Sequence, residues 1–123
     1  MKLETIHEDE RGKIMLLTGD LKEQQEITLF ITNKGYARGG CIHNINDEYC
    51  VVLEGSIKYY IGDEYPKIYN KGMTAFIPKA TPHYFVAQKD CLVAEWGATP
   101  IEKKEKHLKF REIVDKINKE IEK

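Results

Sequence analysis

The chain has 123 residues, of which 41% are hydrophobic and 32% are charged, and its formal net charge is -1. This length suffices for one domain with a single core, and the composition is typical of a globular protein. The dispersed basic residues argue against nucleic-acid binding, and no apolar run approaches the roughly 20 residues that a membrane span requires.

The N-terminal segment MKLETIHEDERG lacks the apolar core of a signal peptide, so we expect a cytoplasmic protein. The three cysteines, Cys41, Cys50 and Cys91, are odd in number and irregularly spaced. This pattern argues against a disulfide framework and fits a reducing compartment.

Short segments with strand character dominate residues 1–98. Apolar or alternating runs rich in Ile, Val, Tyr and Phe cover residues 12–19, 26–33, 48–62, 67–78, 83–88 and 91–97. Gly, Asn, Asp and Pro separate these runs, as is typical of turns between strands. Because no helical period intervenes between them, we expect an antiparallel sandwich or barrel over residues 1–98.

The last segment, residues 99–123, has the period of a helix. Thr99, Pro100 and Glu102 form a typical helix start, namely a cap, a first-turn proline and a capping box. Apolar residues then recur at three- and four-residue steps: Phe110, Ile113, Val114, Ile117 and Ile121. We expect an amphipathic helix that packs on the barrel or on a partner subunit. Its mixed charges argue against a membrane-surface helix.

Side chains able to bind a metal or move a proton gather in the segment RGGCIHNINDEYCVVLEG. Cys41 and His43 share a strand face because side chains alternate along a strand, and Glu48 begins the next strand after the turn NIND. We expect a hairpin with Cys41 and His43 on one arm and Glu48 on the other. His83, which follows Pro82, is the fourth candidate.

At these residues the chain resembles the cupin family. The first cupin motif is glycine, five residues, His-x-His, three or four residues, glutamate, six residues and glycine. Gly35, Cys41, His43, Glu48 and Gly55 fit each interval, with cysteine in place of the first histidine.

The second cupin motif also matches in part. Gly72, Pro78 and His83 stand at its glycine, proline and histidine, while Ala80 replaces a glycine and Ala87 replaces an asparagine. The resemblance implies an all-β double-stranded β-helix, the cupin jelly-roll barrel, with a C-terminal α-helix.

The resemblance also implies a divalent metal ion bound by Cys41, His43, Glu48 and His83. A thiolate is softer than imidazole, so Cys41 favours zinc or iron, with manganese and nickel as alternatives. A further alternative is a site with three ligands in which Cys41 only lines the pocket.

A second resemblance is to the sugar-nucleotide branch of the cupins, whose epimerases and ketoisomerases need no metal. Those enzymes share an early Asp-x-Arg-Gly segment and a later Arg-Gly-x-His-x-His segment. The matching residues are Asp9, Arg11, Gly12, Arg38, Gly39 and His43. Cys41 stands where an epimerase has its base, so His43 would remain as the single base of a ketoisomerase.

Three functions are therefore open. The first is a metal-binding cupin that acts on a small polar metabolite, foremost a carbohydrate or sugar nucleotide, by isomerase or epimerase chemistry. The others are a metal-free sugar-nucleotide 3,4-ketoisomerase and a non-enzymatic module that binds a small ligand. His43 and Glu48 are the candidate catalytic residues, and Arg38 and Tyr36 are the candidate substrate-binding residues.

Tyr59 and Tyr60 could stack on a sugar as well as Tyr36 could, and spacing selects none of them. Tyr49, Val51 and Leu53 have outward parity on their strand, which together with the frequency of two-fold dimers leads us to expect a homodimer.

Overall fold

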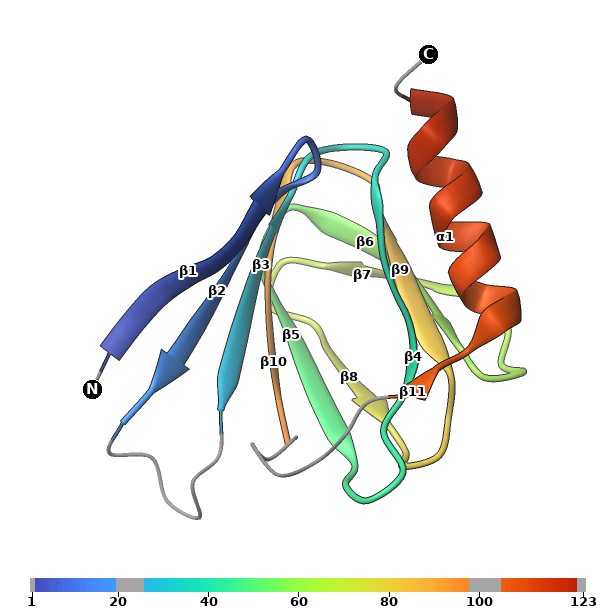
Figure 1. Ribbon diagram of the computed structural model, residues 1–123, viewed down its shortest axis with the longest axis horizontal. Helices are drawn as coiled ribbons and strands as arrows, with labels where there is room; N and C mark the ends of the chain where they lie inside the picture. The colour runs from blue at the N-terminus through green and yellow to red at the C-terminus, as the bar shows by residue number, and fades with distance from the viewer. Residues whose placement is uncertain (1, 20–25, 98–104, 122–123) are drawn as a thin grey trace.

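The computed structural model describes residues 2–19, 26–97 and 105–121 of the chain. Within these residues two antiparallel sheets face each other, and one helix lies outside them (Figure 1). This arrangement confirms the predicted all-β jelly-roll class with a C-terminal helix.

The first sheet, here called sheet A, has the strand order β1-β2-β3-β10-β5-β8. Its strands are β1 (Lys2–Asp9), β2 (Gly12–Thr18), β3 (Ile27–Thr32), β10 (Cys91–Trp96), β5 (Glu48–Glu54) and β8 (Thr74–Ile77). The N-terminal strand β1 was not expected from the sequence, because its residues are mostly polar and all but Asp9 are exposed.

The second sheet, sheet B, has the order β11-β4-β9-β6-β7. Its strands are β11 (Glu105–Lys106), β4 (Ala37–Ile42), β9 (His83–Ala87), β6 (Ser56–Ile61) and β7 (Lys67–Asn70). Gly55, with a φ of 80°, separates β5 from β6, so the chain leaves sheet A and enters sheet B at this glycine.

The core fills one end of the space between the sheets. Buried side chains from both sheets form it, among them Val52 and Val93 from sheet A and Ile57 and Phe85 from sheet B. Alternation places them there: along β5, Glu48, Cys50 and Val52 are buried while Tyr49 and Leu53 are exposed. The other end, where β5 begins and β10 ends, contains a cavity.

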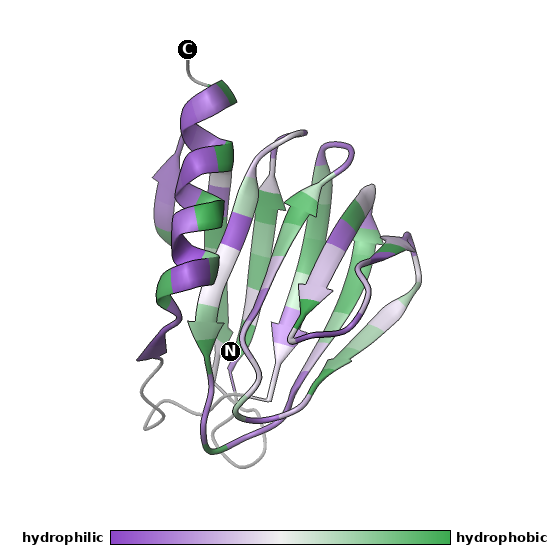
Figure 2. Cartoon of the chain, turned by 90° about the vertical axis from the view of Figure 1, so that its right-hand side faces the viewer, coloured by the Kyte–Doolittle hydropathy of each residue, from purple (hydrophilic) through white to green (hydrophobic). Residues whose placement is uncertain are grey.

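Helix α1 (Leu108–Ile121) covers the outer face of sheet B, with its hydrophobic side toward the sheet (Figure 2). Val114, fully buried, packs with Ala37 and Tyr84. The Asn118 amide accepts a hydrogen bond from the Ala37 N–H (2.8 Å) and donates one to the Ala37 carbonyl (3.1 Å). Residue Ala37 also pairs with Val86 of β9, so the helix satisfies backbone groups of β4 that this pairing leaves available.

The predicted start of this helix is corrected. Residues 105–106 form β11 and pair with Cys41 and Ile42, so they are not helical. The helix begins at Leu108, where Nδ1 of His107 accepts a hydrogen bond from the N–H of Phe110 (3.3 Å) and so caps the first turn. The signature Thr99, Pro100 and Glu102 lies outside the described residues. Among those residues, no helix has the length and apolar character needed to cross a membrane.

Strand β4 contains a β-bulge at Gly39 and Gly40, where its pairing with β9 shifts register. Both glycines have positive φ, and a Cβ on Gly39 would lie 2.8 Å from the carbonyl oxygen of His83. A side chain cannot be placed there without moving backbone. The extra residue reverses the alternation, so Arg38 and Cys41 both face the space between the sheets.

Substitution of this glycine tests the bulge. Gly39→Ala should lower the free energy of unfolding, measured with urea, by about 1–3 kcal/mol more than Gly72→Ala does. Gly72 is the matched control because its φ is also positive, at 87°, but a Cβ there meets nothing within 4 Å. Equal losses in the two variants would show that the close approach of β4 to β9 has no energetic importance.

Candidate metal centre

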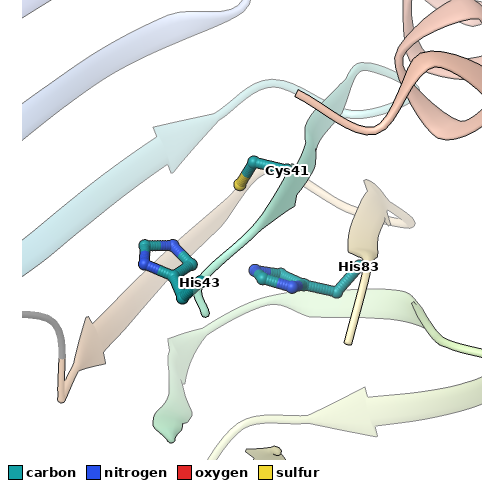
Figure 3. Close-up of side chains that lie close together, drawn as sticks. All are labelled: Cys41, His43 and His83. Atoms are coloured by element: carbon teal, nitrogen blue, oxygen red, sulfur yellow. The ribbon is translucent and has the colours of Figure 1, made fainter. Parts of the chain in front are cut away.

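Three side chains able to bind a metal converge at the open end of the fold. Cys41 lies near the end of β4, His43 follows that strand, and His83 begins β9 as the cross-strand partner of Cys41. Their ligand atoms all lie within 4.8 Å of one another, and the side chains point toward a common centre (Figure 3). Positions far apart in the sequence thus meet because antiparallel pairing places residues 41 and 83 opposite each other.

Glu48 reaches the same point from the other sheet. Its Oε1 lies 2.9 Å from Nε2 of His43 and 3.3 Å from Nε2 of His83. The expected hairpin is wrong: β4 belongs to sheet B and β5 to sheet A, so residues 43–47 cross between the sheets instead of joining paired strands. Because residues 43–47 cross from sheet B to sheet A, Glu48 faces the two histidines from the opposite side of the cavity.

The loop before His83 is fixed to the loop after His43. The N–H of Ala80 donates a hydrogen bond to the carbonyl of His43 (2.6 Å), and the N–H of Lys79 donates one to Asp47 (2.8 Å). Ala80 has a φ of 62°, the left-handed region that favours glycine. This explains why the second cupin motif has a glycine at that position.

Hydrogen bonding sets the orientation of His83. Its Nδ1 donates to the carbonyl of Thr81 (3.0 Å), so Nε2 faces the cluster. A backbone contact of this kind orients histidine ligands in metal sites.

Burial and mutual hydrogen bonding together set the charges of the cluster. Burial opposes ionisation of Cys41, yet hydrogen bonds with His43 and His83 bring the pKa of its thiol down to about 6. Burial alone would lower the pKa of each histidine. Hydrogen bonds to Cys41 and Glu48 outweigh it and raise the pKa of His43 to about 9 and that of His83 to about 11. The carboxylate of Glu48 is held ionised by the two imidazoles, with its pKa well below the usual range.

This donor set fits a transition metal. A thiolate, two imidazole nitrogens and a carboxylate oxygen are four donors of the kinds that zinc and ferrous iron bind. Tetrahedral bonds of about 2.0–2.3 Å place neighbouring donors about 3.3–3.7 Å apart, so donors already within 4.8 Å need only small side-chain movements. Cys41, His43 and His83 therefore form a possible metal site, with Glu48 beside it.

The cluster lines a cavity of about 610 Å³ that also contains Arg38. Arg38 is only 3% exposed, and its guanidinium donates from Nε to Thr32 (2.8 Å) and from Nη2 to the carbonyl of Ile31 (3.0 Å). Burial lowers the pKa of Arg38 to about 10, so the group stays charged at neutral pH. Among the described residues, Nη1 has no hydrogen-bond partner and no carboxylate forms an ion pair with Arg38. Arg38 is therefore a buried cation in the wall of the cavity.

Tyr36 is not among the residues that line this cavity, and its role in substrate binding stays a prediction. Its carbonyl accepts a hydrogen bond from Ala87, at the end of β9 opposite His83. The bulge in β4 does not change the direction of the Tyr36 side chain, because Tyr36 precedes the strand. Tyr59, one of the other tyrosines considered, does line the cavity.

A second carboxyl group in the cavity was missed by the sequence analysis. Glu95 is 8% exposed, and Oε1 accepts a hydrogen bond from the hydroxyl of Tyr59 (2.6 Å). Burial, followed by the nearby charge of Glu48, raises the pKa of Glu95 to about 7. The alternation of CLVAEW, with Cys91 and Val93 buried, was the available signal, since it places Glu95 on the inner face.

The raised pKa of Glu95 predicts a pH-dependent stability. The folded state keeps this proton at pH values where the unfolded chain has lost it, so wild-type stability should fall as the pH rises from 4.5 to 7. Glu95→Gln removes this pH dependence. In metal-free protein, the unfolding free energy of the variant minus that of wild type should therefore increase by about 3 kcal/mol from pH 5 to pH 8.

Urea unfolding of chelator-treated protein at several pH values measures this difference. Glu54→Gln, which changes an exposed carboxylate of β5, is the matched control. Parallel pH profiles for wild type and Glu95→Gln would contradict the assignment of a buried, protonated carboxyl group.

Comparison with known proteins places this chain in a family. The sequence profile of Cupin_2, described as “Cupin domain”, matches residues 30–96, which is more than half of the chain. These residues include Cys41, His43, Glu48 and His83. No curated protein matches the chain.

Solved structures share the fold at low sequence identity. Oxalate decarboxylase from Lactobacillus farciminis superimposes with a TM-score of 0.71 and 18% identity, covering 88% of this chain and 34% of that one. The capsular polysaccharide assembling protein CapF from Staphylococcus aureus gives 0.65 and 18%, covering 79% and 29%. KdgF from Halomonas sp. gives 0.63 and 17%, covering 76% and 85%. The chain spans about a third of the first two proteins but most of the length of KdgF.

Proposed function

The chain belongs to the cupin domain family, and on this basis we propose that it is a metal-dependent enzyme that acts on a small anionic carbohydrate or sugar nucleotide by isomerase or epimerase chemistry. The observation that carries the proposal is one cavity that contains both the cluster Cys41, His43, His83 and the buried cation Arg38. A metal ion and an anion could be bound there side by side.

Arg38 supports the anionic character of the substrate. A guanidinium held by two hydrogen bonds is already oriented, so binding a carboxylate or phosphate beside it costs little conformational entropy. Phe30 lies beside it, with the guanidinium carbon 5.8 Å from the ring centroid, and its apolar surface strengthens the interaction by excluding water.

The cavity is large enough for a sugar with an attached group, since ligand pockets commonly measure about 300–1,000 Å³ and this one measures about 610 Å³. The names of two structural neighbours agree with a carbohydrate or anionic ligand. One is a capsular polysaccharide assembling protein, and the other is a decarboxylase of oxalate, a small dianion.

The proposed chemistry is proton transfer next to a carbonyl group. A divalent ion held by Cys41, His43 and His83 would polarise the carbonyl oxygen of a bound substrate. Glu48 or His43, when not bound to the ion, can accept the proton. Glu95, whose pKa is about 7, can hold a proton on the inner face of sheet A near neutral pH.

One observation favours the metal-free ketoisomerase as a second candidate. Glu48 lies within hydrogen-bond distance of both imidazoles, so the charged cluster is internally balanced without an ion. In that case His43 would be the base at a pH where its imidazole is neutral, since its pKa is raised to about 9. Metal content separates the two candidates.

Metal binding is expected at about one ion per chain. Protein stripped by chelation and then reloaded with zinc or ferrous iron should retain the ion after desalting, as measured by inductively coupled plasma mass spectrometry. Cys41→Ala and His83→Ala should each lower affinity by at least about 10-fold, because each removes a donor. Cys91→Ala is the matched control, since Cys91 is buried outside the cluster. Wild-type protein that retains no ion would exclude the metal-dependent function.

Anion selectivity is expected to depend on Arg38. Titration calorimetry with a hexose, the matching hexuronate and the hexose phosphate should show binding of the anionic sugars in preference to the neutral one. Arg38→Gln should weaken anion binding about 10- to 100-fold, the usual effect of losing a charged hydrogen bond, and should leave neutral-sugar binding unchanged. Lys116→Gln, on the exposed side of α1, is the control. Equal affinities for neutral and anionic sugars in wild type would contradict this role of Arg38.

A further inference from the structure

The cavity extends beyond the metal centre, over the inner face of β2 and β3. Four side chains of these strands line it: Ile14, Leu16, Thr28 and Phe30. Register places them in two neighbouring rows, because Ile14 pairs with Phe30 and Leu16 pairs with Thr28. Three of the four side chains are apolar, and we call Ile14, Leu16 and Phe30 the apolar wall.

Most of the apolar wall is not covered by sheet B. Val93 of β10 and Val52 of β5, which face sheet B, are fully buried in the core. On β2, by contrast, Ile14 and Leu16 are only half-buried, and neither belongs to a core cluster of the described residues. Figure 1 shows the reason, since β1 and β2 lie to one side of the strands of sheet B. The fold therefore leaves this apolar surface accessible from the cavity.

The apolar wall is continuous with the polar groups of the cavity. The guanidinium carbon of Arg38 lies 5.8 Å from the ring centroid of Phe30. In the neighbouring row, Glu95 of β10 pairs with Thr28, which in turn pairs with Leu16. From β10 to β2 the distance is two strand spacings, or about 10 Å. A ligand held at Arg38 can therefore reach the wall with a substituent of the size of one ring.

The charged side chains beyond the apolar wall are paired with one another. Arg11 donates hydrogen bonds from Nε (3.0 Å) and Nη2 (2.8 Å) to Oδ2 of Asp9. Nε2 of His7 lies 2.9 Å from the same oxygen. Because the charges of Arg11 and Asp9 offset each other, this end of the cavity does not favour a second anionic group on the ligand. An uncharged group fits it better.

We propose that the apolar wall is a second binding subsite, which takes a flat apolar group, such as an aromatic ring, attached to the anionic sugar. The proposal rests on the proposed function for the anionic part of the ligand and adds the chemical class of its substituent. Arg38 binds the charged part, and the substituent lies on Ile14 and Leu16.

Burial of apolar surface favours this occupant over a second sugar unit. A ring placed on the wall removes its own surface and that of Ile14 and Leu16 from water, and the gain in affinity grows with the area that is buried. Because the wall belongs to the inner face of a single sheet, a flat ring covers more of it than a branched group does. Phe30 adds an aromatic contact. A second sugar would gain less, since its hydroxyl groups would lose hydrogen bonds to water.

Titration calorimetry of the full-length protein with four glycosides tests the subsite. The ligands are the methyl and the 4-nitrophenyl glycosides of glucose and of glucuronic acid, so that the aromatic ring and the charge vary independently. With either sugar, the 4-nitrophenyl glycoside should bind at least about 10-fold more tightly than the methyl glycoside, because the ring is buried on the wall. The preference for glucuronide over glucoside measures the contribution of Arg38 separately.

A matched pair of variants locates the effect of the ring. Leu16→Asn should reduce the advantage of the 4-nitrophenyl group to about 2-fold or less and leave the affinity for methyl glucuronide unchanged. Leu17→Asn is the control, because Leu17 is the next residue of β2, faces the other side of the sheet and does not line the cavity. Ile14→Asn should act like Leu16→Asn and replaces it if that variant does not fold. Circular dichroism establishes that each variant is folded.

Two results would overturn the subsite. One is a wild type that gains no affinity from the ring on either sugar, which includes the case in which none of the four ligands binds. The other is an advantage of the ring that survives both Leu16→Asn and Ile14→Asn in folded protein. An advantage of the ring without any preference for glucuronide would support the subsite and contradict the proposed role of Arg38, so the two claims can fail separately.

Discussion

The structure depends on burying a thiol, two imidazoles and a carboxyl group at one point between two sheets. Each ionisable group taken out of water loses several kcal/mol of solvation free energy, and pairing between the groups is needed to offset this loss. Here Glu48 lies 2.9 Å from His43 and 3.3 Å from His83, and Cys41 hydrogen-bonds to both imidazoles. The groups stabilise each other's charged forms, and the same arrangement that makes their burial possible provides the donors for a metal ion.

Backbone geometry makes this arrangement possible. The Gly39–Gly40 bulge reverses the alternation of β4, so that Arg38 and Cys41 reach the same cavity although they are three residues apart. The crossing of residues 43–47 between sheets places Glu48 opposite the histidines, and the bond from Ala80 to His43 connects the two loops. The site therefore lies where both sheets and these two loops meet, and the buried guanidinium of Arg38 shares the cavity with the candidate metal cluster.

The sequence predicted which side chains meet in the cavity better than it predicted the path of the chain. Motif intervals located Cys41, His43, Glu48 and His83 because the spacing of residues around a turn is a local property. The hairpin was wrong, since whether consecutive strands share a sheet depends on contacts with distant strands. The Gly-Gly pair was the local signal for the bulge. Glu95 was missed because its function depends on neighbours from other strands, and the helix start was placed too early because β11 forms only by pairing with β4.

X-ray absorption spectroscopy of the zinc-loaded protein tests the central claim most directly, because it reports the atoms bound to the ion. We expect one sulfur scatterer at about 2.3 Å, together with nitrogen or oxygen scatterers at about 2.0–2.1 Å and the outer-shell pattern of two imidazoles. In Cys41→Ser the sulfur scatterer should disappear while the imidazole pattern remains. A spectrum of wild type that lacks sulfur, or that shows no imidazole, would contradict the convergence of Cys41, His43 and His83 on one metal ion.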